Sequence, residues 1–175
     1  MFRNRRGTSL ALAVAVPLTA LTLAACGGSS GSSSTSTAQP TTSSGKTATV
    51  GLASEGGLGK ILVDSQGHTL YLFEKDTGTK STCTGACAEQ WPPLGASGKP
   101  VVGSGLSASK IGTTPRSDGA AEVTYNGHPL YLFAGDSKPG DTNGQGITAF
   151  GGGWFALSAS GNKVSGTGTG SSSGY

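Results

Sequence analysis

Two cysteines lie close together in the middle of the chain, Cys83 and Cys87, with Gly85 between them. In an oxidising compartment outside the cytoplasm, such a pair forms a disulfide that closes a small loop. The alternative is a redox-active dithiol or part of a metal site. The C-x₃-C spacing differs from the C-x₂-C of thioredoxin-type and zinc-ribbon motifs. The sequence therefore predicts a structural disulfide between Cys83 and Cys87.

The chain has two histidines, His68 and His128, and both occupy the same position in an internal repeat. If the two copies pack about a two-fold axis, the imidazoles could meet and join the thiolates of Cys83 and Cys87 in a site for copper or zinc. The alternative is that each imidazole caps its own hairpin beside a turn glycine. We expect the structural role, and we predict no metal or other cofactor.

Two carboxylates, Asp76 and Asp136, also recur at equivalent positions, just after a predicted strand. A pair of carboxylates can perform acid–base chemistry if one lies in a cleft that raises its pKa. Aspartate at the start of a loop more often accepts hydrogen bonds from nearby main-chain N–H groups in an Asx-turn. We expect the turn role, and the sequence predicts no catalytic residue.

The N-terminus has the features of an export signal. Arg3, Arg5 and Arg6 precede an apolar run at 10–23, which is shorter than the ~20 apolar residues that a membrane span needs. The run ends in Leu-Ala-Ala-Cys, and this segment resembles the bacterial lipobox, in which the cysteine is acylated with chains such as palmitate. The sequence therefore predicts a signal peptide at 1–25 and a lipid anchor at Cys26, since two or more acyl chains anchor a protein stably.

The rest of the chain divides by composition. Residues 26–49 are rich in Ser, Thr and Gly and lack an apolar face, which predicts a flexible tether. Residues 166–175 predict a flexible tail for the same reason, and residues 50–165 remain as one small domain. Three of the twelve basic residues precede the predicted cleavage site, so the mature chain has nine basic and nine acidic residues. This neutral balance lacks the clustered basic face that nucleic-acid binding requires.

A segment of seven residues occurs twice, at 67–73 and 127–133, with six identities and an offset of 60 residues. Each copy has the pattern Tyr-x-Phe-x-x-Asp. The motif residues are Tyr71, Phe73 and Asp76 in the first copy and Tyr131, Phe133 and Asp136 in the second. Two copies are too few for a solenoid. We therefore expect two similar halves, at about 58–94 and 118–157, that pack about a pseudo-two-fold axis and bury the motif aromatics in one core.

Each half is predicted to contain a β-hairpin, then a loop and a strand that carries a tryptophan. Asn126-Gly127 between two strand-like runs is the strongest short hairpin signal. Residues 64–67 predict a longer turn in the first half, and a helical turn is expected near 85–90. The fold class is all-β, a small sandwich or barrel-like domain of two hairpin-based repeats. Trp91 and Trp154 are expected in its core, the alternative being an aromatic platform for glycans or peptides.

These motifs together resemble a bacterial family of secreted-repeat lipoproteins, common in actinobacteria. The resemblance rests on the paired Tyr-x-Phe-x-x-Asp motifs, the segment from Cys83 to Leu94, and the run from Asp118 to Tyr131. It implies a two-repeat domain on the extracytoplasmic face of the bacterial cell membrane, and it carries over no catalytic residue. We expect a lipid-anchored, non-catalytic module that binds an envelope protein or glycan. The alternatives are a redox or metal-handling lipoprotein and an envelope hydrolase.

Overall fold

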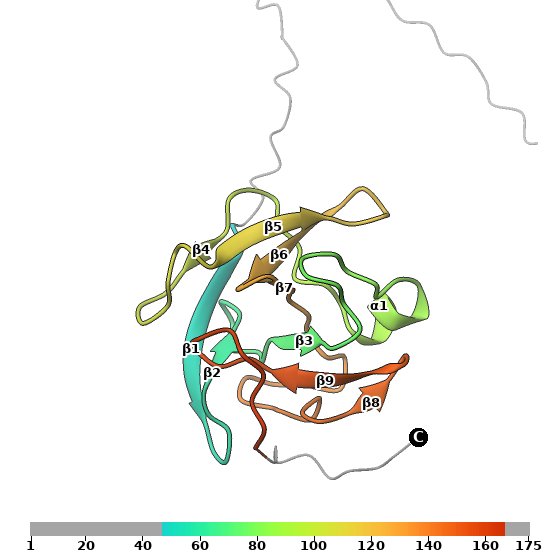
Figure 1. Cartoon of the computed structure of the whole chain (residues 1–175). Helices are drawn as coiled ribbons and strands as arrows, with labels where there is room; N and C mark the ends of the chain where they lie inside the picture. The colour runs from blue at the N-terminus through green and yellow to red at the C-terminus, as the bar shows by residue number, and fades with distance from the viewer. Residues whose placement is uncertain (1–46, 167–175) are drawn as a thin grey trace, which may run out of the picture. The chain divides into compact units, whose positions relative to one another are not determined.

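The computed structural model describes residues 47–166. The predicted signal peptide, Cys26, most of the predicted tether and all but the first residue of the predicted tail lie outside this range. The strands are β1 (Thr49–Glu55), β2 (Gly59–Val63), β3 (Tyr71–Phe73), β4 (Val101–Val102), β5 (Ile111–Pro115), β6 (Ala121–Tyr125), β7 (His128–Pro129), β8 (Thr148–Ala149) and β9 (Gly152–Ala156). Within the described range one short helix, α1 (Ala86–Gln90), follows β3 in the chain (Figure 1).

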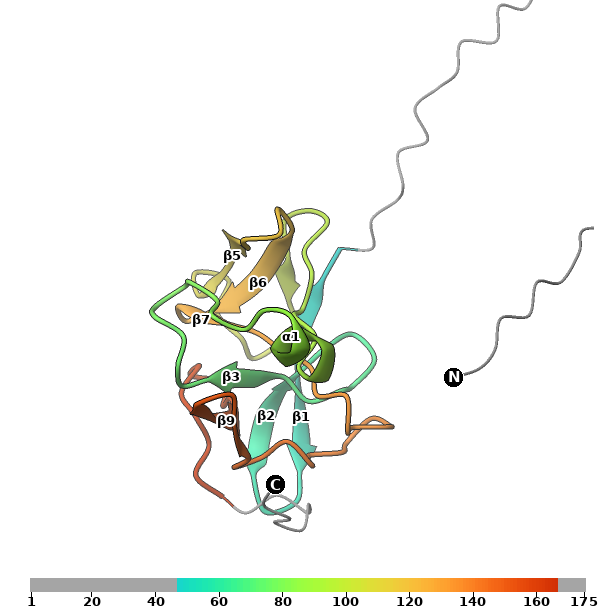
Figure 2. The same cartoon turned by 90° about the vertical axis from the view of Figure 1, so that its right-hand side faces the viewer.

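The strands form three sheets of three strands each, in the orders β2-β1-β4, β3-β9-β8 and β5-β6-β7. Figure 2 shows the sheet of β5, β6 and β7 on one side of β3 and the hairpin of β1 and β2 on the other. The all-β prediction is confirmed. Within residues 47–166 the three small sheets do not close into a barrel. Strand β1 carries few large apolar residues, and its sequence does not predict a strand. Residues 51–55 of β1 pair with β2, and residues 49–50 pair with β4.

Each half contains a tight turn just before its motif segment, and local residues stabilise both turns. Asn126 and Gly127 have φ angles of 51° and 85°, which are the left-handed values that a type I′ turn between β6 and β7 requires. In the first half, Asp64 Oδ1 accepts hydrogen bonds from the main-chain N–H groups of Gln66 and His68 at 2.8 and 2.9 Å. Both turns therefore return the chain into the segment that carries the repeated motif.

The two motif segments meet at Tyr71 and Tyr131. The Tyr71 N–H donates to the Tyr131 carbonyl at 2.8 Å, and the Tyr131 N–H donates to the Tyr71 carbonyl at 3.0 Å. Equivalent residues that exchange both hydrogen bonds in an antiparallel bridge are what a local two-fold axis produces. The centre of the domain is therefore the contact between the two repeats.

The tryptophan segments are exchanged between the repeats. Strand β9, which carries Trp154 at the end of the second repeat, pairs with β3 of the first repeat. Segment 92–94, which follows Trp91, hydrogen-bonds to segment 130–132 of the second repeat. Each repeat thus completes the other, and neither contains all of its own strand partners.

The core has two parts, one on each face of the motif segments. Tyr71 and Phe73 face an aromatic cluster, and Leu70 and Leu72 face an aliphatic one. The aromatic cluster includes Trp91, Tyr131 and Trp154, and the aliphatic cluster includes Val50, Leu62, Val123, Leu130 and Leu157. Segment 70–73 is buried on both sides, as its unbroken apolar sequence predicts.

Candidate functional site

The repeated tyrosines and aspartates are joined across the repeats. The Tyr71 hydroxyl donates to Asp136 Oδ2 at 2.7 Å, and the Tyr131 hydroxyl donates to Asp76 Oδ2, also at 2.7 Å. The other carboxylate oxygen of each aspartate accepts a main-chain N–H from its own loop, from Thr82 for Asp76 and from Asn143 for Asp136. The local part of this arrangement is the predicted turn role, and the bond to the other repeat was not predicted.

Burial fixes the protonation of these groups. Desolvation is the main cause that raises the pKa of Tyr71 and of Tyr131 above the ordinary value, and the nearby carboxylates raise it further. Burial also raises the pKa of Asp136, while the hydrogen bond from Tyr71 opposes this shift. The phenols therefore remain protonated donors, and their role at these positions is to join the repeats.

A second polar group lies beside Tyr131. Glu122 has no exposed surface, and its Oε2 accepts a hydrogen bond from Arg116 Nη1 at 2.8 Å. Arg116 also donates to the Ser81 hydroxyl and to the Cys83 carbonyl. Burial is the main cause that raises the pKa of Glu122 to about 7, and Arg116 opposes it. The arginine thus ties the loop after β3 to strand β6.

A disulfide joins Cys83 and Cys87. The two residues are 0% and 6% exposed, so the disulfide is closed to large reactants. Within residues 47–166, no group of three or more His, Cys, Asp or Glu side chains is placed to hold a metal ion. The set of two cysteines and two histidines considered from the sequence is therefore not assembled.

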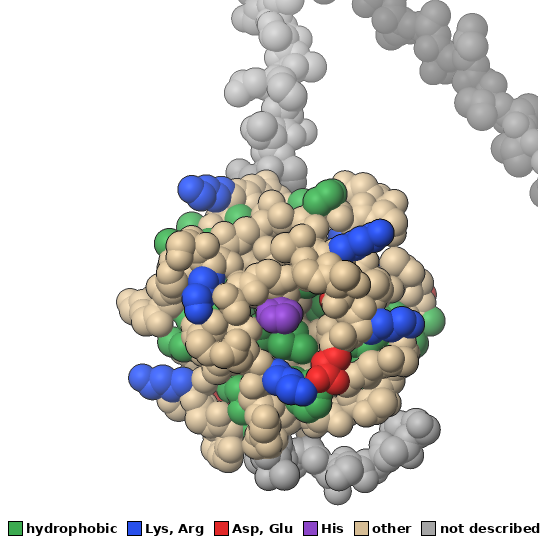
Figure 3. Space-filling model, viewed as in Figure 1, with side chains coloured by type: hydrophobic (Ala, Val, Ile, Leu, Met, Phe, Trp, Pro, Cys, Tyr) green, Lys and Arg blue, Asp and Glu red, His purple; other side chains and the backbone are tan. Residues whose placement is uncertain are grey.

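The two histidines have different surroundings although their sequence positions are equivalent. His68 Nδ1 lies 3.3 Å from Asp64 Oδ2, beside its own turn, as the hairpin role predicts. His128 is half-buried and lines a surface hollow of about 350 Å³. Figure 3 shows this face, with a histidine in the hollow and a basic and an acidic side chain beside it. The hollow is the candidate binding site.

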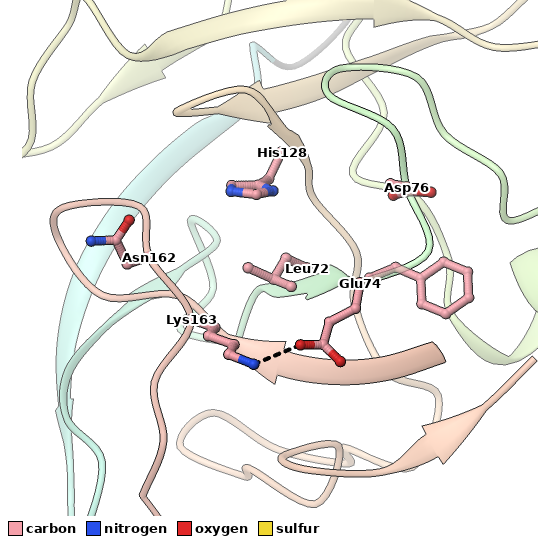
Figure 4. Close-up of a pocket in the computed structure, with 7 residues that line it drawn as sticks. Leu72, Glu74, Asp76, His128, Asn162 and Lys163 are labelled. Carbon is pink, nitrogen blue, oxygen red and sulfur yellow. Dashed lines mark hydrogen bonds and ion pairs between the residues drawn. The ribbon is translucent and has the colours of Figure 1, made fainter. Parts of the chain in front are cut away.

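Both repeats contribute to this hollow, which we call the His128 pocket (Figure 4). Its lining residues are Leu72, Phe73, Glu74, Asp76, His128, Asn162 and Lys163. Lys163 Nζ and Glu74 Oε1 form an ion pair of 2.6 Å, and the two side chains are 49% and 41% exposed. Within the described residues 47–166, the imidazole of His128 has no hydrogen-bond or ion-pair partner. The pocket therefore offers an imidazole and an accessible pair of opposite charges.

The equivalent place beside His68 is filled by the loop that follows Asp136. The Gly140 N–H donates to the Gly67 carbonyl at 3.2 Å, and the Thr69 hydroxyl donates to the Asp141 carbonyl at 2.7 Å. The approximate two-fold symmetry is broken here, and the broken symmetry leaves the His128 side open.

The aromatic-platform alternative is wrong for Trp91 and Trp154, because both are 0% exposed. Their rings stack on each other with centroids 3.9 Å apart, and Phe73 stacks on Trp154 at 4.1 Å. Phe133 lies against Trp91 at 4.3 Å but is only partly buried, so the motif aromatics are not equally enclosed. These rings form the core that joins the repeats.

Sequence reasoning missed Glu74, Asn162 and Lys163, which line the His128 pocket. Glu74 and Lys163 are 89 positions apart, and neither is a Tyr, Phe or Asp of the repeated motif. One signal was present in the sequence: the second repeat has Ala134 where the first has Glu74. A charged residue that departs from the repeat marks a position where the two halves have different roles.

Two segments, 53–95 and 112–158, match the model of a family described as a secreted repeat of unknown function. The two matches enclose the two repeats, and together they cover about half of the chain. Comparisons with curated proteins and with solved structures gave no match.

Proposed function

The chain belongs to this family of secreted repeats, and from that premise we propose that it is a lipid-anchored, non-catalytic binding module on the outer face of the bacterial cell membrane. Membership of the family gives the extracellular location. The attachment and the binding role are our proposal, and the His128 pocket is the single observation that supports the binding role most strongly.

Attachment through Cys26 is supported by the N-terminal sequence. The basic residues, the apolar run and the Leu-Ala-Ala-Cys segment stand in the order of a lipoprotein signal. Within residues 47–166, no helix has the length and hydrophobicity to cross a membrane. Acyl chains on Cys26 would hold the domain at the surface, with a Ser, Thr and Gly-rich tether between anchor and fold.

Binding is supported by the construction of the His128 pocket. Ligand sites are concave, combine apolar surface with a few polar groups, and often lie where two structural units meet. The pocket has a floor from Leu72 and Phe73 and polar groups at its rim, and it lies between the repeats. Its volume of about 350 Å³ suits a small ligand or the end of a larger envelope molecule.

A non-catalytic role is supported by the carboxylates of the motif. Asp76 accepts hydrogen bonds from Tyr131, from the Thr82 N–H and from the Thr82 hydroxyl. Asp136 is held in the same way by Tyr71 and by the Asn143 N–H. A catalytic acid or base must exchange protons with substrate, whereas these oxygens are committed to joining the repeats.

The experiment uses the processed lipoprotein and envelope material isolated from the producing bacterium. The protein is incubated with sedimented envelope, and the bound fraction is measured for the wild type, for His128→Ala and for His68→Ala. His68 is a matched control because it is the equivalent residue outside the pocket. We expect His128→Ala to lower the bound fraction severalfold and His68→Ala to leave it unchanged. Equal binding by all three proteins would contradict the proposed site.

A further inference from the structure

The His128 pocket carries opposite charges at its rim, and these charges indicate the class of ligand. Lys163 and Glu74 reach the rim from segments far apart in the chain, from after β9 and from after β3. Figure 4 shows the two side chains pointing toward one another on one side of the pocket. Because both are about half exposed, their mutual attraction contributes little to stability, and a ligand can compete for either side chain. The Lys163 ammonium also lies over the Phe155 ring, 4.7 Å from its centroid, and this contact holds the ammonium beside the pocket.

The remaining polar groups of the pocket differ in whether they already have hydrogen-bond partners within the protein. Both carboxylate oxygens of Asp76 already accept hydrogen bonds, from Thr82 and from Tyr131, so Asp76 is not available to a ligand. The His128 imidazole has no partner within residues 47–166, and the Asn162 side chain also lines the pocket. The groups available to a ligand are therefore one ammonium, one carboxylate, one imidazole and one amide.

From this set we propose that the pocket binds a small zwitterion, a molecule with an ammonium group and a carboxylate group a few bonds apart, such as a free amino acid or a dipeptide. The proposal rests on the proposed function, because it names the ligand class of the same site. The ligand ammonium pairs with Glu74, and the ligand carboxylate pairs with Lys163. His128 and Asn162 contact the rest of the ligand.

Charge matching explains why a zwitterion fits better than an ion of one sign. An anion that approaches Lys163 also approaches Glu74, and a cation that approaches Glu74 also approaches Lys163. A molecule with both charges takes the place of each partner of the Glu74–Lys163 ion pair, so neither of these two side chains is left unpaired. A neutral sugar would leave the Glu74–Lys163 pair as it is and would gain hydrogen bonds alone.

The experiment is calorimetric titration of the processed full-length lipoprotein in an uncharged detergent. The probes are alanyl-alanine, its N-acetyl derivative, which keeps the carboxylate, its amide, which keeps the ammonium, and chitobiose as a neutral sugar. We expect alanyl-alanine to bind about tenfold tighter or more than either singly charged analogue, because each lost charge removes a charge-assisted hydrogen bond. Lys163→Gln and Glu74→Gln should each weaken binding of alanyl-alanine by about the same factor.

Lys99→Gln is the matched control, because Lys99 is exposed and lines a separate hollow with Ile111 and Thr113. It should bind alanyl-alanine as the wild type does. The zwitterion proposal is overturned if no probe binds, or if both singly charged analogues bind as tightly as alanyl-alanine. Chitobiose binding that His128→Ala abolishes would overturn the zwitterion and keep the proposed function. Envelope binding that is insensitive to His128→Ala would overturn the proposed site itself.

Discussion

Tyr71 donates its hydroxyl hydrogen bond to Asp136, which lies 65 positions away in the other repeat, and Tyr131 makes the same bond in return to Asp76. The Tyr-x-Phe-x-x-Asp motif therefore makes the contact between the repeats. The tyrosine of each copy donates a hydrogen bond to the aspartate of the other copy. This relationship explains why the motif occurs twice, since one copy alone would leave a buried tyrosine hydroxyl without its acceptor.

Removal of either tyrosine hydroxyl should destabilise the domain. We expect Tyr71→Phe and Tyr131→Phe each to lower the free energy of unfolding by about 1–3 kcal/mol, because a half-buried carboxylate loses its donor from the other repeat. Denaturant unfolding of the full chain measures the change. In double-mutant cycles, Tyr71→Phe should couple with Asp136→Asn and be additive with Asp76→Asn to within about 0.5 kcal/mol. Coupling of Tyr71→Phe with Asp76→Asn, and not with Asp136→Asn, would contradict the hydrogen bonds between the repeats.

The two motif phenylalanines should differ in their contribution to stability. Phe73 is 2% exposed and stacks on Trp154, so Phe73→Ala should cost about 3–5 kcal/mol and lower the melting temperature by about ten degrees or more. Phe133 is partly exposed, so Phe133→Ala should cost less. Calorimetric melting of both variants compares them. Equal losses of stability in the two variants would show that the deeper burial of Phe73 does not increase its contribution to stability.

Stability should depend on pH through Glu122. Burial raises the pKa of Glu122 to about 7 in the folded protein, above the ordinary value of 4.5. Between these values the folded protein holds a proton that the unfolded chain has released. The contribution of Glu122 is therefore fully present below about pH 4.5 and is lost as the pH rises through about 7. Glu122→Gln, which does not titrate, should flatten this fall in melting temperature between pH 5 and 8. If the melting temperature of Glu122→Gln falls with pH as that of the wild type does, the pH dependence arises from groups other than Glu122.

Anchoring should depend on Cys26. In Cys26→Ala, we expect lipoprotein signal peptidase to leave the precursor uncut and the acyl chains to be absent. Mass spectrometry of the protein from the producing bacterium reports both processing and acylation. A Cys26→Ala protein that is cut after Ala25 and still carries acyl chains would disprove the anchor.

Much of the fold could be predicted from local sequence. The Asn126-Gly127 turn and the all-β class follow from residues whose effects are local, since a glycine or an apolar run constrains its own neighbours. The repeat follows from direct identity. Strand β1 could not be predicted, because Thr49–Glu55 owes its conformation to pairing with β2 and β4 rather than to its own side chains.

The candidate site could be predicted only in part. His128 and Asp76 can be found from the repeat, but nothing in the repeated motif itself favours His128 over His68. The difference arises where the loop at 137–141 closes one side, and that is a long-range contact. Glu74 and Lys163 meet because β3 and β9 pair, so their relation depends on the exchange of strands between repeats.

The most direct test of the binding site is hydrogen–deuterium exchange of the processed lipoprotein, measured with and without isolated envelope material. If the His128 pocket binds an envelope ligand, exchange should slow at 72–76, at 128 and at 162–163, the segments that line the pocket. Segments 67–69 and 137–141, which meet on the equivalent closed side, should be unchanged. Protection confined to other segments, with none at the pocket, would contradict the proposed site.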